Sequence, residues 1–312
     1  IRVIHSPEFS LAVGAASRCM LIDMGKVIVG SEAIRAGTVT RGQLRWNYRS
    51  IFPDVYVRKD LEVTVAERSR GAYLWSGRRG VITGRAAAAL HGARWIADTV
   101  PVEVIWANNH SPTGIVSRRE PIAPGEITWH RGIPIAKPER AALDIGRHLA
   151  RDEAVAHLDA LARATGIAAP DILELTYRYK GSRGVRKCRE AVALMDAGAE
   201  SPQESRLRLT LIDLGFPRPF TQIPMVDASG YVFARLDMGW PDLKIAVEYD
   251  GEHHRTDDAQ YRRDGRRLRR INAMGWIVIR VMKGDRRHEI KAWVQEAIAQ
   301  REREAMAVKM SA

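Results

Sequence analysis

One apolar run that carries acids constrains the fold of this 312-residue chain more than any other feature. Residues 245–250 have the sequence IAVEYD, which predicts a core strand with Glu248 inside it. Because side chains alternate across a strand, Glu248 and Asp250 belong to one face and Val247 to the other. The C-terminal third is therefore expected to contain a sheet with two carboxylates on one face.

A neighbouring strand is expected to add a third acid. Residues 231–240, YVFARLDMGW, predict a strand that ends at Asp237, and a hairpin would set Asp237 beside Glu248 and Asp250. Three carboxylates this close cannot all stay ionised unless a cation lies among them. We therefore expect the three acids to bind Mg²⁺ or Mn²⁺, hard ions that suit oxygen ligands. The alternative is that Asp250 and Gly251 only form a turn.

The segments on either side of these acids hold further candidates. Ser201 and Pro202 begin a predicted helix whose first turn contains Glu204. Glu204 could join the acids, or it could only complement the helix dipole. Two adjacent histidines follow the acids, and at most one is expected to act because neighbouring residues of a strand face opposite ways. The candidate catalytic residues are Asp237, Glu248, Asp250, Glu204, His253 and His254.

A basic helix is predicted directly after the acids, in residues 261–276, YRRDGRRLRRINAMGW. Its six arginines are accompanied by one acid, Asp264, and would repel one another without an anion. A solvated charged helix is the alternative. The candidate contacts to the phosphates of double-stranded DNA are Arg262, Arg266, Arg269 and Arg270.

The overall charge also favours a polyanionic partner. The chain has 49 Lys and Arg residues against 37 Asp and Glu, and a formal net charge of +12. Such an excess favours nucleic acid over a membrane, and no apolar run approaches the roughly 20 residues that span a bilayer. The two cysteines, Cys19 and Cys188, cannot build a disulfide framework, which favours a cytoplasmic location.

The N-terminal part predicts a helix-turn-helix followed by a β wing. Within residues 26–100, SEAIRAGTVTRGQLRW predicts two helices separated by a turn at Gly37, with Thr40 capping the second helix. The strand VYVR follows and would belong to the wing. A solvated basic face is again the alternative. The candidate DNA contacts, spaced four apart on the second helix, are Arg41, Arg45 and Arg49.

The whole chain is expected to have an α/β (α+β) fold. Four histidines of its middle part lack metal-ligand spacing and are expected to be structural, and Met20 or Met24 could be the true start. The expected parts are a disordered leader in residues 1–25, the winged helix in 26–100, an α/β and helical connector in 101–198, the domain with the acids in 199–300, and a tail in 301–312.

The first half resembles the winged-helix and connecting region of AbiEi-type antitoxins. The resemblance covers roughly residues 26–160 and lies in AGTVTRGQLR, VYV, GRAAAALHG and KPERAALDIGR. It implies a DNA-binding element, which in that family is tied to transcriptional autoregulation. It implies no chemistry.

Residues 200–300 resemble very-short-patch-repair-like endonucleases of the PD-(D/E)XK superfamily, and within them an actinobacterial group. The resemblance lies in LDMGWPDLKIAVEYDGEHH and RRDGRRLRRINAMGWIVIRV. It implies a mixed sheet flanked by helices, with Asp237 as the metal-bridging aspartate, Glu248 as the second acid and Glu204 as the helix acid. One of the two histidines would serve as a base or a phosphate contact.

The motif departs from that family at two points. Leu236 stands before Asp237 where the pattern has proline, and Asp250 replaces the lysine that follows Glu248. Without this lysine the usual water-polarising cation is missing, and the domain could bind DNA without cutting it. The residues that could supply the cation are His253, His254 and Lys244.

The sequence thus predicts a DNA-binding protein that hydrolyses DNA phosphodiester bonds with Mg²⁺ or Mn²⁺ as its cofactor. The alternative is a non-catalytic, antitoxin-like transcriptional regulator that only binds DNA. A third hypothesis is a protein-interaction partner in a toxin pair, in which the acids are structural. A toxin or a second copy of the chain is the possible protein partner.

Overall fold

The computed structural model describes residues 26–107, 110–251 and 258–311. The predicted leader and the candidate histidines, His253 and His254, lie outside the described residues. No helix of the described part is long and apolar enough to cross a membrane.

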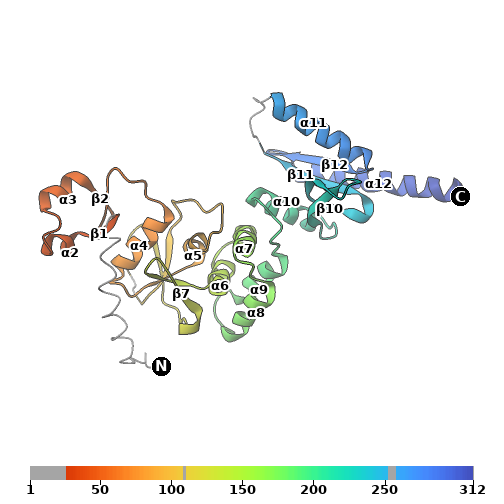
Figure 1. The fold of residues 1–312 in the computed structure, drawn as a ribbon. Coiled ribbons are helices and arrows are strands. Elements are labelled where there is room, and N and C mark those ends of the chain that lie inside the picture. Colours follow the sequence, from red (N-terminus) through yellow and green to blue (C-terminus); the bar gives the residue numbers. More distant parts are fainter. Residues whose placement is uncertain (1–25, 108–109, 252–257, 312) are drawn as a thin grey trace. The chain divides into compact units, whose positions relative to one another are not determined.

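The chain divides into two compact units. Unit 1 holds the described residues up to His148 together with Pro170–Cys188, and unit 2 holds Leu149–Ala169 together with the described residues from Arg189 onward. Each unit combines helices with sheet, so the predicted mixed α and β fold is confirmed (Figure 1).

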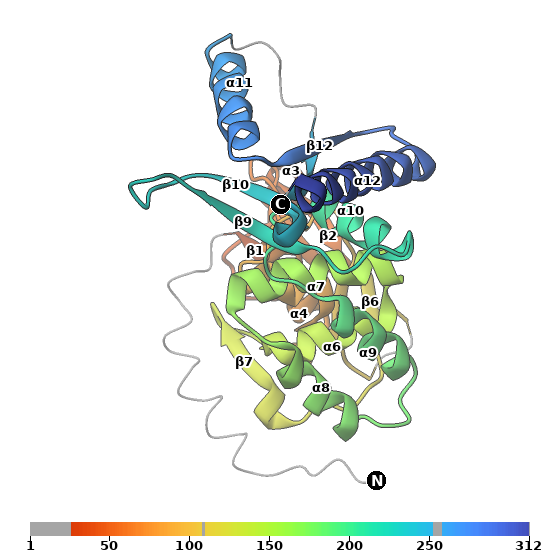
Figure 2. The ribbon, with the colours of Figure 1, turned by 90° about the vertical axis from the view of Figure 1, so that its right-hand side faces the viewer.

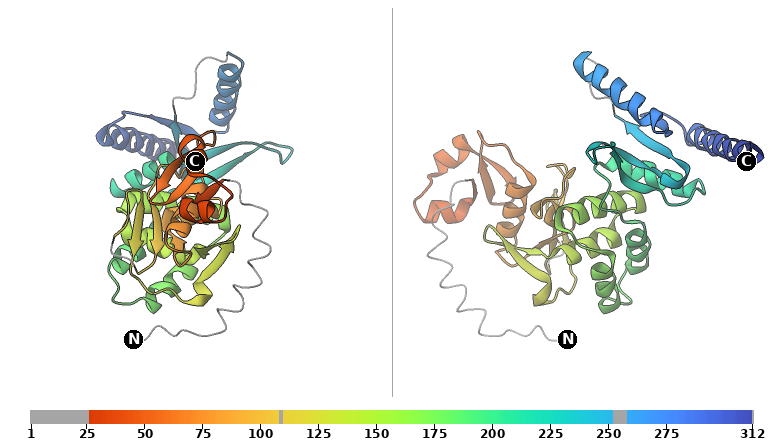
Figure 3. Two further views of the ribbon diagram at one scale, coloured as in Figure 1. Left: turned by 90° about the vertical axis from the view of Figure 1, so that its left-hand side faces the viewer. Right: turned by 45° about the vertical axis from the view of Figure 1, so that its right-hand side comes forward.

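Unit 1 begins with a small antiparallel sheet of strand order β1-β3-β2. Phe52, Val55 and Val57 are buried in it, and helix α4 packs against all three strands. Two short helices precede the hairpin, as the sequence predicted (red and orange elements in Figure 3). The elements are β1 (Val27–Val29), α2 (Gly30–Arg35), α3 (Arg41–Asn47), β2 (Tyr48–Phe52), β3 (Val55–Arg58) and α4 (Val65–Trp75).

The start of α3 is fixed by a reciprocal cap, which confirms the role predicted for Thr40. The Thr40 hydroxyl accepts a hydrogen bond from the Gln43 N–H at 3.1 Å, and the Gln43 side chain accepts one from the Thr40 N–H at 2.9 Å. Such a capping box satisfies two helix N–H groups that have no partner within the helix. The helix ends at Asn47 because Tyr48 is extended and pairs with Arg58 of β3.

A five-stranded sheet of order β6-β5-β4-β8-β7 forms the rest of the core of unit 1. The predicted alanine-rich helix is α5, and Ala86, Ala87 and Ala88 have no exposed surface because it packs closely on the sheet and on α6. The predicted buried strand, VEVI, is β5. The elements are β4 (Val81–Thr83), α5 (Gly84–Leu90), β5 (Val102–Ile105), β6 (Ile115–Arg118), η1 (Pro124–Glu126), β7 (Ile127–His130), β8 (Ile133–Ala136) and α6 (Pro138–His148).

Three helices follow α6 along the chain: α7 (Arg151–Thr165), α8 (Ala169–Arg178) and α9 (Val185–Leu194). The last two are the helices predicted on either side of the basic turn YKGSRGVRK. Gly184 in this turn has φ 83°, and a Cβ atom there would lie 2.4 Å from the carbonyl oxygen of Arg147. Only glycine fits this close approach of two backbone segments.

Unit 2 is built on a four-stranded sheet of order β12-β11-β10-β9. Strands β11 and β12 are parallel and the other pairs antiparallel, so the sheet is mixed. Strand β10 continues past Asp237, where it was predicted to end, because Met238 and Trp240 still pack into the core. The elements are α10 (Pro202–Asp213), β9 (Phe220–Val226), β10 (Val232–Trp240), η2 (Pro241–Leu243), β11 (Ile245–Asp250), α11 (Asp258–Ala273), β12 (Ile277–Met282) and α12 (Arg287–Ser311).

Helices cover both faces of this sheet, and this arrangement determines what Glu248 meets. Ile245 and Val247 pack with residues of α10 and α12, whereas Ala246 packs with Ile271 of α11. Figure 2 shows α11 and α12 on different sides of the strands. Since Glu248 follows the alternation of Ala246, its side chain belongs to the face covered by α11.

Candidate functional site

Helix α3 is the most exposed regular element near the N-terminus. It has no buried residue; Leu44 is half-buried, and Arg41 and Arg45 are exposed. Trp46 is 73% exposed, and the guanidinium carbon of Arg45 lies 5.9 Å from the centre of its ring. The helix therefore presents a basic and aromatic surface to solvent, with no acid in its first turn.

The third arginine of the predicted series lies elsewhere. Arg49 is in β2 and not on α3, because the helix ends two residues earlier. Its guanidinium donates to the carbonyl oxygen of Leu61 at 2.8 Å. Lys59, which follows β3, donates a hydrogen bond to the carbonyl oxygen of Arg45 on α3 at 3.2 Å. The predicted four-residue spacing on one helix face is therefore wrong for Arg49.

Two of the three predicted acids of unit 2 are brought together. Met238 pairs with Val247 in the antiparallel pair of β10 and β11, so Asp237 lies opposite Glu248 at the next position of the register. The Tyr249 N–H donates to the Asp237 carboxylate at 2.9 Å. Asp250 is exposed at the end of β11 and lies 3.6 Å from the guanidinium of Arg280 on β12.

The environment of Asp237 disfavours a charged carboxylate. Burial raises the pKa of Asp237 to about 7, and the nearby charges of Glu204 and Glu248 act in the same direction. The hydrogen bond from Tyr249 and the charge of Arg267 lower it again, but by less. Perturbed carboxyl groups are typical of functional sites, although structural ion-pair networks also produce them.

Glu248 is 7% exposed and is held by an arginine that the sequence analysis did not single out. Arg267 of α11 donates to both of its carboxylate oxygens, the longer hydrogen bond being 3.2 Å. The same guanidinium donates to the carbonyl oxygen of Arg235 at 2.8 Å. The available signal was spacing, since Arg267 lies four residues before the buried Ile271 and thus on the same helix face.

Glu204 lies in the first turn of α10, whose N-cap is Ser201. Its carboxylate accepts hydrogen bonds from the Ser201 hydroxyl and from the Glu200 N–H, both at 2.9 Å. These contacts are local to the start of the helix. The sequence left open whether Glu204 joins the acids or only complements the helix dipole. Lys244, one candidate for the missing cation, donates to the carbonyl oxygen of Met274 at 3.1 Å.

The chemistry of the acids suits a hard divalent ion, because carboxylate oxygens are the ligands that Mg²⁺ prefers. The hydrogen bonds that these acids now make leave no room for such an ion, since Arg267 binds both oxygens of Glu248. Among the described residues, Asp237, Glu248 and Asp250 do not form a group whose ligand atoms all lie within 4.8 Å of one another. The donor set therefore fits the ion only if Arg267 is displaced.

The arginines of α11 differ from one another in what they contact. Arg266 and Arg269 are exposed, as expected for phosphate contacts. Arg270 stacks 3.8 Å from the ring centre of Phe233 and donates to Asp227 at 2.9 Å, so it is tied to the β9–β10 hairpin. The side chain of Arg262 lies outside the described part of the structure.

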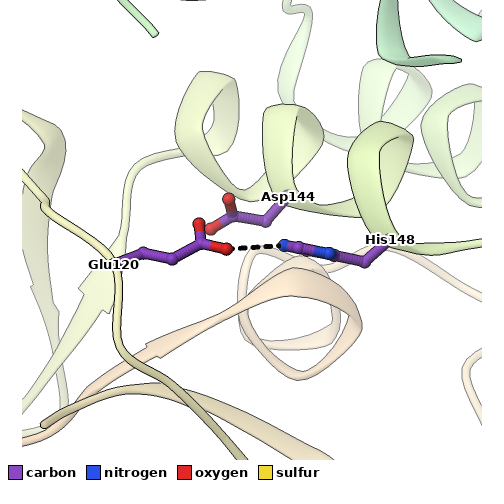
Figure 4. Close-up of side chains that lie close together, drawn as sticks. All are labelled: Glu120, Asp144 and His148. Carbon is purple, nitrogen blue, oxygen red and sulfur yellow. Dashed lines mark ion pairs between the residues drawn. The ribbon is translucent and has the colours of Figure 1, made fainter. Parts of the chain in front are cut away.

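A second group of titratable residues lies in unit 1 (Figure 4). Glu120, Asp144 and His148 place ligand atoms within 4.8 Å of one another, and His148 Nε2 is 3.2 Å from Glu120. Arg147 donates to Glu120 at 2.6 Å, and Arg140 donates to Asp144 at 3.1 Å. Because two arginines already neutralise the two acids, we assign this group to the ion-pair network of the core.

One comparison with known proteins concerns the middle of the chain. Residues 80–197, from the residue before β4 to just beyond the end of α9, match the family model described as the AbiEi antitoxin C-terminal domain. Uncharacterised proteins from two strains of Mycobacterium tuberculosis are 34% identical over 152 residues, which is 49% of this chain and 56% of theirs. The chain thus spans about half the length of the curated relatives it matches, and its second sheet with the helices α6 to α9 is similar to the C-terminal domain of AbiEi antitoxins.

Proposed function

We propose that the protein is a DNA-binding regulator of the antitoxin type, and that α3 is its contact with duplex DNA. The observation that carries the proposal is the surface of α3, a capped helix without a buried residue that exposes Arg41, Arg45 and Trp46. A helix that makes so little contact with its own protein is free to enter a groove of DNA. Arginines supply the phosphate and base contacts, and the net charge of +12 supplies the long-range attraction.

The match of residues 80–197 to an antitoxin domain supports the regulatory part of this proposal. An antitoxin has a toxin as its natural partner, so a protein partner in addition to DNA is part of the proposed function. Autoregulation would place the DNA site upstream of the protein's own gene.

Binding of the full chain to a labelled duplex from its own upstream region tests the proposal. Arg41→Ala with Arg45→Ala should weaken binding and lower the slope of log affinity against log salt by about 0.9 for each phosphate that these arginines neutralise. Arg94→Ala is a matched control, because Arg94 also lies against a neighbouring tryptophan, 5.2 Å from the ring centre of Trp95, but in the α5–β5 loop. Equal affinities of the double variant and the wild type at low salt would remove α3 from the proposal.

A second candidate function is metal-dependent cleavage of DNA by unit 2. It is favoured by the placement of Asp237 beside Glu248 on adjacent strands, with Glu204 close enough to affect the pKa of Asp237. A bound Mg²⁺ or Mn²⁺ would activate water for attack on a phosphodiester, and Asp237 and Glu248 would be its ligands once Arg267 is displaced.

Incubation of the full chain with supercoiled, mismatched and single-stranded DNA tests this second candidate. Nicking should appear with Mg²⁺ or Mn²⁺, disappear with a chelator and be abolished in Asp237→Asn. If a folded wild-type protein cuts none of these substrates with either ion, the non-catalytic regulator remains.

A further inference from the structure

The point at which the acids of unit 2 need a cation is filled by a side chain of the same unit. Arg267 binds both oxygens of Glu248, and its Nη2 atom also binds the carbonyl oxygen of Arg235. The guanidinium is therefore held by β11 and by β10 at once. A bidentate arginine pair of this kind is shorter and more directional than a lysine contact.

We propose that Arg267 is the resident cation of the Asp237–Glu248 pair, and that it keeps this pair from binding divalent metal ions. The proposal concerns unit 2 alone and is independent of DNA binding by α3. It excludes the second candidate function, because metal-dependent cleavage needs the divalent ion that Arg267 keeps out. It assigns to Arg267 the charge compensation that the sequence attributed to a metal.

The position of the arginine on its helix supports a permanent role. Ile271, one turn further along α11, has no exposed surface and packs against Ala246 of the sheet. This contact fixes the helix face that carries Arg267 against Glu248. The side chain of Arg267 is 27% exposed and that of Glu248 is 9% exposed, so both charges are largely removed from water.

Because Glu248 is largely shielded from water, its carboxylate favours Arg267 over a divalent ion. A buried carboxylate requires a partner, and the arginine satisfies both oxygens without an ion. A divalent ion would have to displace a guanidinium that has three hydrogen bonds, and the displaced arginine would repel the ion from nearby. The exposed neighbours Arg266 and Arg269 remain available to an external anion.

Titration of the full chain with Mn²⁺, followed by calorimetry and by the decrease of the free Mn²⁺ electron paramagnetic resonance signal, tests the proposal. The wild type should show no saturable binding that depends on Glu248, so its titration should coincide with that of Glu248→Gln. Arg267→Met should create one saturable Mn²⁺ site. Its affinity should be roughly 10–100-fold above that of the residual, Glu248-independent binding by the wild type, the range over which groups around a metal alter its affinity. Arg267→Met with Glu248→Gln should abolish that site.

Arg280→Met is the matched control, because it removes an arginine from another acid of the same sheet, the exposed Asp250. It should create no site. Saturable Mn²⁺ binding by the wild type that Glu248→Gln abolishes would overturn the proposal, and this comparison does not require Arg267→Met to fold. A folded Arg267→Met protein that binds no Mn²⁺ would overturn it as well.

Discussion

Arg208 of α10 donates a hydrogen bond to Asp159 of α7 at 2.7 Å, and both side chains are buried. The Asp159 carboxylate also accepts from the Ser205 hydroxyl and from the Asp196 N–H, each at 2.7 Å. These contacts hold α7 against α10 within unit 2. The family match to residues 80–197 includes α7, so the matched segment extends beyond unit 1.

Asp159→Asn should destabilise unit 2 by about 3–5 kcal/mol, because it leaves the charge of Arg208 buried without a counter-ion. Burial raises the pKa of Asp159, and the charge of Arg208 and the hydrogen bonds of the carboxylate oppose this. Urea unfolding of the full chain measures the change. Asp213→Asn removes the partly exposed partner of Arg151 and should cost less than about 1 kcal/mol; equal effects in both variants would contradict the assignment.

Trp46→Ala should weaken DNA binding while leaving the free energy of unfolding almost unchanged. Because Trp46 is 73% exposed, it contributes little to folding, and its removal should change the free energy of unfolding by less than about 0.5 kcal/mol. DNA affinity should fall by more than about 1 kcal/mol, as expected when a tryptophan inside an interface is truncated. Trp129→Ala on β7, 64% exposed, is the control and should alter neither quantity.

The N-terminal cap of α3 should affect DNA binding, because it stabilises the helix that carries the proposed contacts. Thr40→Ala removes the acceptor for the Gln43 N–H and should cost about 1 kcal/mol of stability in unit 1. Because Arg41 and Arg45 are placed by the helix, DNA affinity should fall with it. Thr40→Ser keeps the hydroxyl and should restore both quantities; a serine variant as weak as the alanine variant would show that the threonine methyl group matters and not the cap.

The features that the sequence predicted well depend on residues close together in the chain. The cap of α3 needs only Thr40 and Gln43, and the alternation in β11 that separates Glu248 from Val247 needs only a strand. In each case the chemistry of a few consecutive residues determines the result.

The features that the sequence missed depend on partners far along the chain. Helix α3 ends before Arg49 because Tyr48 pairs with Arg58 of β3, and no local signal separates the two arginines of α3 from the third. The arginines of α11 differ in the sequence only by their spacing from Ile271. Arg267 differs from its neighbours only because Ile271 sets the face of the helix that meets the sheet.

The ion-pair network of unit 1 should make its stability depend on pH in acid. Burial alone would raise the pKa of Glu120, but its interactions with His148 and Arg147 outweigh burial and lower the pKa to about 2. Arg140 lies 3.8 Å from the same carboxylate, and Asp144 binds both arginines.

A carboxyl group whose pKa is lower in the folded chain binds its proton more readily after unfolding, so its stabilising contribution is present above about pH 4.5 and disappears as the pH falls toward 2. Glu120→Gln should therefore be less stable than the wild type at neutral pH, and the difference should shrink between pH 4.5 and pH 2. Thermal unfolding across this range measures it. Glu174→Gln removes an exposed acid and is the control. A Glu120→Gln deficit that stays constant down to pH 2 would show that the glutamate acts through packing and not through its charge.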